Sequence, residues 1–269
     1  MKTLCLFVAF GLLSSFAVAG DGEGCPGCKP AGAKPTTLAA ARQQIADIPK
    51  ADEKLPAEQL KEVKAAREFL MQTSFGKAMG PSFESCGRLM LAAAIQPGTS
   101  AESAALMKDM AATYCSVAKI FGGCADCKEC CPDGECPECK GATPESCAAK
   151  AKESLDASQK LLTKAMEEMP KATPEFMQKV QAAADTLEKK SPCWPAIMSA
   201  TKALNEAYAS LAKMGIPAAK DVSARDQLVK SAFQLHTSLT ACHGGEGQCE
   251  ENEGCEDAEE PAEAPEKSS

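Results

Sequence analysis

Apolar residues recur along the chain at spacings of three, four and seven, which is the period of amphipathic helices. Leu60, Val63 and Leu70 form one such stripe. No run of residues alternates between apolar and polar side chains as a half-buried strand does. Thr143 and Thr173 each precede a proline, and this pair is typical of a helix start with proline at the first helical position. The sequence therefore predicts an all-α protein.

Two parts of the chain resemble each other with the order of matches preserved, which indicates an internal duplication. Residues 58–66 align with residues 175–183, and chance similarity between helices rich in Ala, Lys and Glu is the competing explanation. Each copy holds four helices, and short connections favour antiparallel neighbours. We expect two tandem up-down four-helix bundles, with repeat 1 at residues 36–123 and repeat 2 at residues 143–245. A continuous array of eight helices is the alternative.

The N-terminus has the pattern of a secretory signal peptide. Lys2 precedes an apolar stretch at residues 4–16, and small residues at 17–19 predict cleavage after Ala19. The stretch is short for a bilayer-spanning helix, which needs about 20 residues. We therefore expect residues 1–19 to be removed and the mature protein to be secreted or periplasmic, with no membrane association.

The net charge of the chain narrows the classes of molecule that we expect it to bind. The chain of 269 residues has a formal net charge of -8 and a pI of about 5.1. The excess of acidic residues lies in the tail at residues 246–269, which has no large apolar side chain and is predicted to be disordered. Nucleic-acid binding needs clustered Lys and Arg, so we expect no nucleic-acid partner.

Most of the 16 cysteines lie in clusters outside the expected helices. Exported cysteines usually pair, so we expect a disulfide-rich linker at residues 124–142 and a cysteine-containing N-terminal segment at residues 20–35. Metal binding is the alternative, because paired Cys-x2-Cys motifs can hold a thiophilic ion such as Zn or Cu(I). Two short segments, residues 136–141 and residues 25–29, resemble zinc-ribbon knuckles. The candidate ligands are Cys124, Cys127, Cys136, Cys139, Cys25 and Cys28.

The isolated cysteines predict two further disulfides. Cys193 and Cys242 are nearly equidistant from a turn expected near Ala218, so an antiparallel hairpin would bring them level. Cys86 and Cys115 flank the turn expected near residue 98 less evenly, and two buried thiols are the competing interpretation for this pair.

Catalytic motifs are missing from the sequence. There is no Gly-x-Ser-x-Gly elbow, no His-Glu-x2-His motif and no phosphate-binding glycine loop. A thiol–disulfide oxidoreductase would need its Cys-x2-Cys in an α/β fold. His236 and His243 could join Cys242 or Cys249 at a metal, and the methionines fit core packing better than copper ligation.

Together these observations favour a non-enzymatic structural or interaction protein without a cofactor. Its protein partner, if it has one, is not identified by the sequence. Binding of Zn or Cu is the first alternative, and thiol–disulfide exchange is the second.

Overall fold

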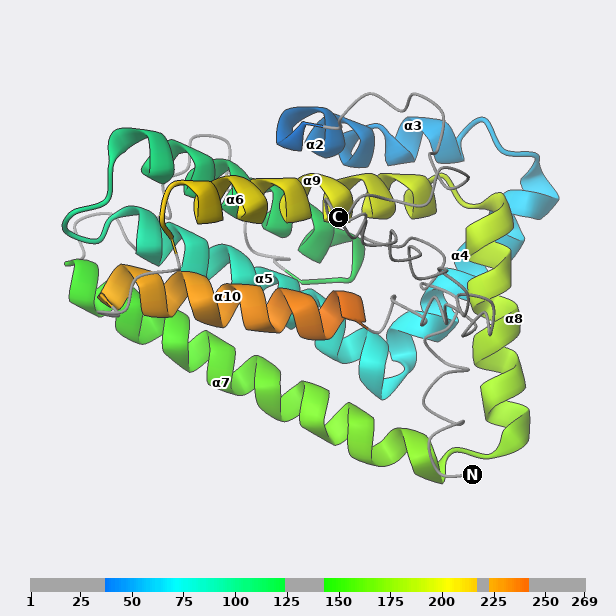
Figure 1. Cartoon of the computed structure of the whole chain (residues 1–269). Coiled ribbons are helices and arrows are strands. Elements are labelled where there is room, and N and C mark those ends of the chain that lie inside the picture. Colours follow the sequence, from blue (N-terminus) through cyan, green and yellow to red (C-terminus); the bar gives the residue numbers. More distant parts are fainter. Residues whose placement is uncertain (1–36, 124–142, 217–222, 242–269) are drawn as a thin grey trace, which may run out of the picture.

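The computed structural model describes residues 37–123, 143–216 and 223–241, and every regular element in these ranges is a helix. The first half contains α2 (Leu38–Ala46), α3 (Ile48–Asp52), α4 (Ala57–Gln72), α5 (Ser74–Ala94) and α6 (Ala101–Ile120). The second half contains α7 (Pro144–Glu168), the short 3₁₀ helix η3 (Met169–Lys171), α8 (Pro174–Lys190), α9 (Cys193–Lys213) and α10 (Ala224–Ala241). The prediction of an all-α protein is confirmed over these ranges (Figure 1).

The predicted helix starts are also confirmed. The Thr143 side chain accepts a hydrogen bond from the backbone N–H of Ser146 at the start of α7. Thr173 caps α8 in the same way, accepting from the backbone N–H of Phe176. These hydroxyls satisfy N–H groups that have no partner within the helix. Among the described residues, no helix has the length and apolar character needed to cross a bilayer.

The long helix α5 lies at the centre of the packing and contacts α6, α7 and α10 (Figure 1). Helices α4 and α8 pair with each other at one end, and α2 lies against α6 and α9. Two separate bundles are not confirmed, because α2 packs on α9 from the second half and α7 packs on α5 from the first. One buried cluster accordingly joins both halves, with members that include Ala41, Leu89, Met110, Leu155, Leu204 and Leu239.

Small residues allow the helices to approach closely. At the end of α6 the backbone passes directly over α5, where Gly80 faces Gly123. A Cβ atom added to Gly80 would lie 2.6 Å from the carbonyl oxygen of Phe121, so only glycine fits this contact. The buried alanines serve the same purpose along the rest of the core.

A polar group is buried in the middle of this core. The Tyr114 hydroxyl donates a hydrogen bond to the Tyr208 hydroxyl at 2.9 Å, which joins α6 to α9. His236 of α10 packs against both rings, and its Nε2 lies 2.8 Å from Oδ1 of Asn205. Burial is the main cause that raises the pKa of both tyrosines well above their ordinary value of 10.0.

The two buried tyrosines predict a loss of stability at alkaline pH. Tyr114 and Tyr208 are the only tyrosines in the chain, so tyrosinate absorbance reports them alone. In the unfolded chain they ionise near the ordinary pKa, whereas the fold keeps both hydroxyls protonated. The contribution of the two protonated tyrosines to the free energy of unfolding is therefore complete below about pH 10. It is lost as the pH rises above this value. We expect tyrosinate absorbance to appear together with the loss of helical circular dichroism. Full ionisation near pH 10 with the helices intact would contradict this arrangement.

Candidate functional site

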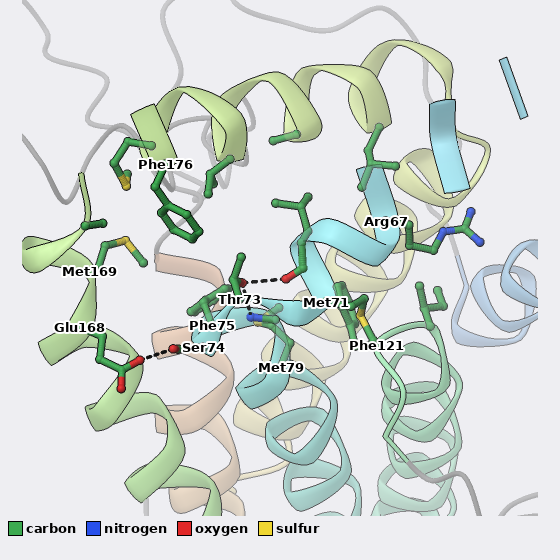
Figure 2. Close-up of a pocket in the computed structure, with 18 of the residues that line it drawn as sticks. Arg67, Met71, Thr73, Ser74, Phe75, Met79, Phe121, Glu168, Met169 and Phe176 are labelled. Atoms are coloured by element: carbon green, nitrogen blue, oxygen red, sulfur yellow. Dashed lines mark hydrogen bonds between the residues drawn. The ribbon is translucent and has the colours of Figure 1, made fainter. Parts of the chain in front are cut away.

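The structure contains a cavity of about 580 Å³ between the α4–α5 segment on one side and α8 and the start of α9 on the other (Figure 2). The end of α6 contributes to its wall, and the corner between α7 and α8 lies at one end. Ligand sites in proteins usually have volumes of about 300–1,000 Å³, so the cavity is large enough for a small molecule.

The cavity walls are predominantly apolar. Flexible thioethers alternate with aromatic rings and branched side chains, a combination that adapts to hydrophobic ligands of irregular shape. The apolar lining includes Leu70, Met71, Phe75, Met79, Phe83, Phe121, Met169, Phe176, Met177, Val180, Leu187, Trp194 and Ile197. Trp194 is the only tryptophan in the chain, so its fluorescence reports on this cavity alone.

A sharp break between α4 and α5 helps to open the cavity. Thr73 is extended, with φ -64° and ψ 155°, and it separates the two helices. Its Oγ1 donates to the carbonyl oxygen of Leu70 at 2.7 Å and accepts from the Gly76 N–H at 3.0 Å (Figure 2). A Cβ on Gly76 would lie only 2.0 Å from the Leu70 carbonyl oxygen, so this tight turn requires glycine.

The opposite wall has a matching break between α8 and α9. Ser191 is extended and ends α8, and its Oγ accepts from the Cys193 N–H at 3.2 Å. The two helices that end at these breaks, α4 and α8, bury only small apolar residues. These are Val63, Ala66, Val180 and Ala183. The larger side chains of both helices are therefore free to line the cavity.

One end of the cavity carries a thiol in a polar setting. Cys193 is the first residue of α9 and is 5% exposed. Its sulfur accepts hydrogen bonds from Nη2 of Arg67 at 2.6 Å and from Oγ of Ser191 at 3.0 Å. Arg67 also pairs with Asp52, at 3.4 Å between Nη2 and Oδ2. In the described part of the chain, no hydrogen bond joins Cys193 to a histidine or a carboxylate, the groups that activate nucleophilic thiols.

The other end lies at the corner formed by α7, η3 and α8. Ser74 at the start of α5 donates a hydrogen bond to Oε2 of Glu168, which joins α5 to the end of α7 (Figure 2). Glu168 also pairs with Lys164 at 3.8 Å. Phe176 lines the cavity and is 39% exposed, so the lining reaches solvent here. Lys171 also lines the cavity and is exposed.

The described cysteines that were expected to form disulfides lie in different surroundings. Cys86 is a buried free thiol whose sulfur lies 3.7 Å from the carbonyl oxygen of Ala232 on α10, and burial raises its pKa. Its expected partner Cys115 lies on α6 against Gly87, and the disulfide between them stays a prediction. Although α5 and α6 are neighbours, the Cys86 side chain reaches toward α10. Cys193 is likewise a free thiol in the structure, and its expected partner at position 242 is outside the described residues.

The expected metal ligands also fall outside the described ranges. This applies to Cys25, Cys28, Cys124, Cys127, Cys136 and Cys139, and to the linker at residues 124–142 as a whole. Within the described ranges, no group of three or more His, Cys, Asp or Glu residues is placed to hold a metal ion. The site that the structure does contain was not predicted from the sequence, because its lining residues belong to helical stripes that indicate a packed core.

Gly76 provides a test of the α4–α5 break. Replacing a helical glycine with alanine normally stabilises a protein by about 0.5–1 kcal/mol. Gly76→Ala should instead destabilise the fold by about 1–3 kcal/mol, because the new methyl group meets the Leu70 carbonyl. Chemical denaturation monitored by circular dichroism measures this difference. A stabilised variant would show that the turn tolerates a side chain.

Comparisons with protein-family models, curated protein sequences and solved structures gave no match, so the interpretation of this cavity rests on its own geometry.

Proposed function

We propose that the protein is an exported, non-enzymatic helical protein that binds a hydrophobic small molecule in the cavity between α4, α5, α8 and α9. The observation that carries this proposal is an apolar cavity of about 580 Å³ that opens to solvent beside Phe176. Burying apolar ligand surface against such walls is favourable without any catalytic group. The predicted signal peptide supports a secreted or periplasmic location for this binding.

The sequence outside the described ranges offers little that could fill the cavity. Apart from the predicted signal peptide, those segments contain one large apolar residue, Val222. The linker at 124–142 and the tail at 246–269 consist of cysteines, charged, amide and small residues, and prolines. A separate molecule is therefore the better candidate for the occupant.

We further propose that the two halves arose by duplication and exchanged helices. The aligned helices α4 and α8 bury equivalent residues, Val63 with Val180 and Ala66 with Ala183. Under the same alignment, the contact of α2 with α9 is equivalent to that of α7 with α5. The cavity lies where the equivalent pairs α4–α5 and α8–α9 face each other, as expected for a ligand site formed between two repeats.

The cysteine-rich segments fit this proposal as stabilising cross-links. We propose that cysteines of residues 20–35 and 124–142 form disulfides or hold a thiophilic ion, and thereby stabilise the exported protein. Metal analysis and intact mass under non-reducing conditions distinguish these two options, since disulfides remove two hydrogens per bond and bind no Zn or Cu.

A filled cavity should abolish binding. Ala184 lines the cavity on α8, and Ala184→Phe would occupy part of the ligand volume. Ala182 is exposed on the same helix, so Ala182→Phe is the matched control. The probe is the neutral apolar dye N-phenyl-1-naphthylamine, whose fluorescence rises on burial and which should also change Trp194 emission.

We expect one dye per chain for the unchanged protein and for Ala182→Phe. Ala184→Phe should weaken binding by about tenfold or more. No saturable binding by the unchanged protein, or equal binding by the two variants, would contradict the proposed function.

A further inference from the structure

The lining of the cavity extends along α8. Its lining residues on that helix recur every three or four positions, as Phe176, Val180, Ala184 and Leu187. The eleven residue-to-residue steps from Phe176 to Leu187 correspond to about 16 Å at 1.5 Å per residue. Figure 2 shows the lining side chains following α8 along its length, with the α4–α5 segment opposite. A lining that runs over this length of α8 can accompany a linear ligand from end to end, which a compact ligand would not use.

The volume sets the size of that ligand. A methylene group is similar in size to a water molecule, which occupies about 30 Å³ in the liquid. A cavity of about 580 Å³ therefore holds on the order of twenty such groups when it is completely filled. Ligands usually leave part of a site unfilled, so an alkyl chain of roughly 12–16 carbons fits both the volume and the length.

The charges at the two ends are different. At one end Arg67 is paired with Asp52 and Cys193, and Figure 2 shows its guanidinium directed away from the cavity. At the other end the charge of Glu168 is balanced by Lys164 and by the Ser74 hydrogen bond. The charges of Arg67 and Glu168 are thus each paired within the protein, and of the Arg67 guanidinium only Nε is buried without a hydrogen-bond partner.

Lys171 is the exception. It lines the edge of the cavity on η3 and is exposed, and no ion pair or hydrogen bond joins its side chain to another described residue. It lines the same cavity as Phe176, where the lining reaches solvent, so a headgroup at the opening is expected to meet a positive charge. A carboxylate or phosphate is favoured there, and a quaternary ammonium is not.

We propose that the ligand is a single-chain amphiphile, with its alkyl chain lying along α8 inside the cavity and its anionic headgroup beside Lys171. This inference rests on the proposed function and specifies the ligand class of the same cavity. Fatty acids and alkyl phosphates share the required chemistry, and the two headgroups can be compared at equal chain length.

The test is a series of saturated fatty acids of 8–18 carbons, titrated below their micelle-forming concentrations and followed by Trp194 fluorescence. Affinity should rise about fourfold for each added methylene, as expected for burial of one CH₂ group. The increase should stop at roughly 12–16 carbons, when the cavity is full. The alkyl phosphate of the best length should bind as well as the acid, while the alcohol and the trimethylammonium compound should bind more weakly.

Two lysine variants test the position of the headgroup. Lys171→Gln should weaken binding of the acid by about two- to fivefold, the range of an exposed ion pair, and leave the alcohol unchanged. Lys179 is exposed on α8 and does not line the cavity, so Lys179→Gln is the matched control and should have no effect. The difference between acid and alcohol should shrink at high salt.

The outcomes separate this inference from the proposed function. Affinity that does not depend on chain length, or tighter binding of a compact sterol than of any alkyl chain, would overturn the linear ligand while the dye still binds. Equal binding of acid, alcohol and ammonium compounds would overturn the anionic headgroup. If neither the dye nor any amphiphile binds, the proposed function itself is contradicted.

Discussion

The tight break between α4 and α5 is the constraint on which the cavity depends. Thr73 satisfies the Leu70 carbonyl and the Gly76 N–H at once, and the missing side chain of Gly76 lets the two helix ends come together. Because the chain changes direction here, α4 leaves the core formed around α5 and pairs with α8 instead. The break at Ser191 has the same effect on α8 and α9. Thr73 and Ser191 thus hold the amphipathic helices α4 and α8 away from the core. Apolar side chains line the space that this leaves.

The rest of the molecule is packed in a different way. In the core, glycines and alanines allow close helix contacts, and the polar atoms of Tyr114 and Tyr208 satisfy each other. Around the cavity the side chains are longer and more flexible, with Met71 and Met177 only partly buried. A rigid core beside an adaptable cavity is the arrangement expected of a protein that binds a hydrophobic molecule without reshaping its whole fold.

Helical periodicity was enough to predict that the described residues form helices only. The threonine–proline pairs located the starts of α7 and α8, because a cap depends only on residues within one turn. The packing of the two halves on each other could not be predicted, since equivalent stripes have the same pattern whether they bury against their own copy or the other one. Leu70 and Leu187 belong to regular stripes for the same reason, yet they line a cavity.

The surroundings of Cys193 were equally hidden in the sequence. Its hydrogen-bond donor Arg67 is 126 positions away along the chain. A local sequence pattern cannot indicate a contact between residues so far apart. Counting residues from an expected turn placed Cys193 opposite position 242, but such counting cannot anticipate a guanidinium from α4. The position of the Cys86 sulfur against α10 could not be predicted either, because residue spacing along a hairpin gives no information on which neighbouring helix a side chain faces.

A methionine methyl spectrum, recorded by nuclear magnetic resonance during titration with a fatty acid of about 14 carbons, tests the central claim most directly. Met79, Met169 and Met177 line the cavity, whereas Met107 and Met110 are fully buried in the core. The account predicts that the cavity methyl signals shift in a saturable manner while the core signals stay in place. Unchanged cavity signals at saturating ligand, or shifts confined to the core methionines, would contradict it.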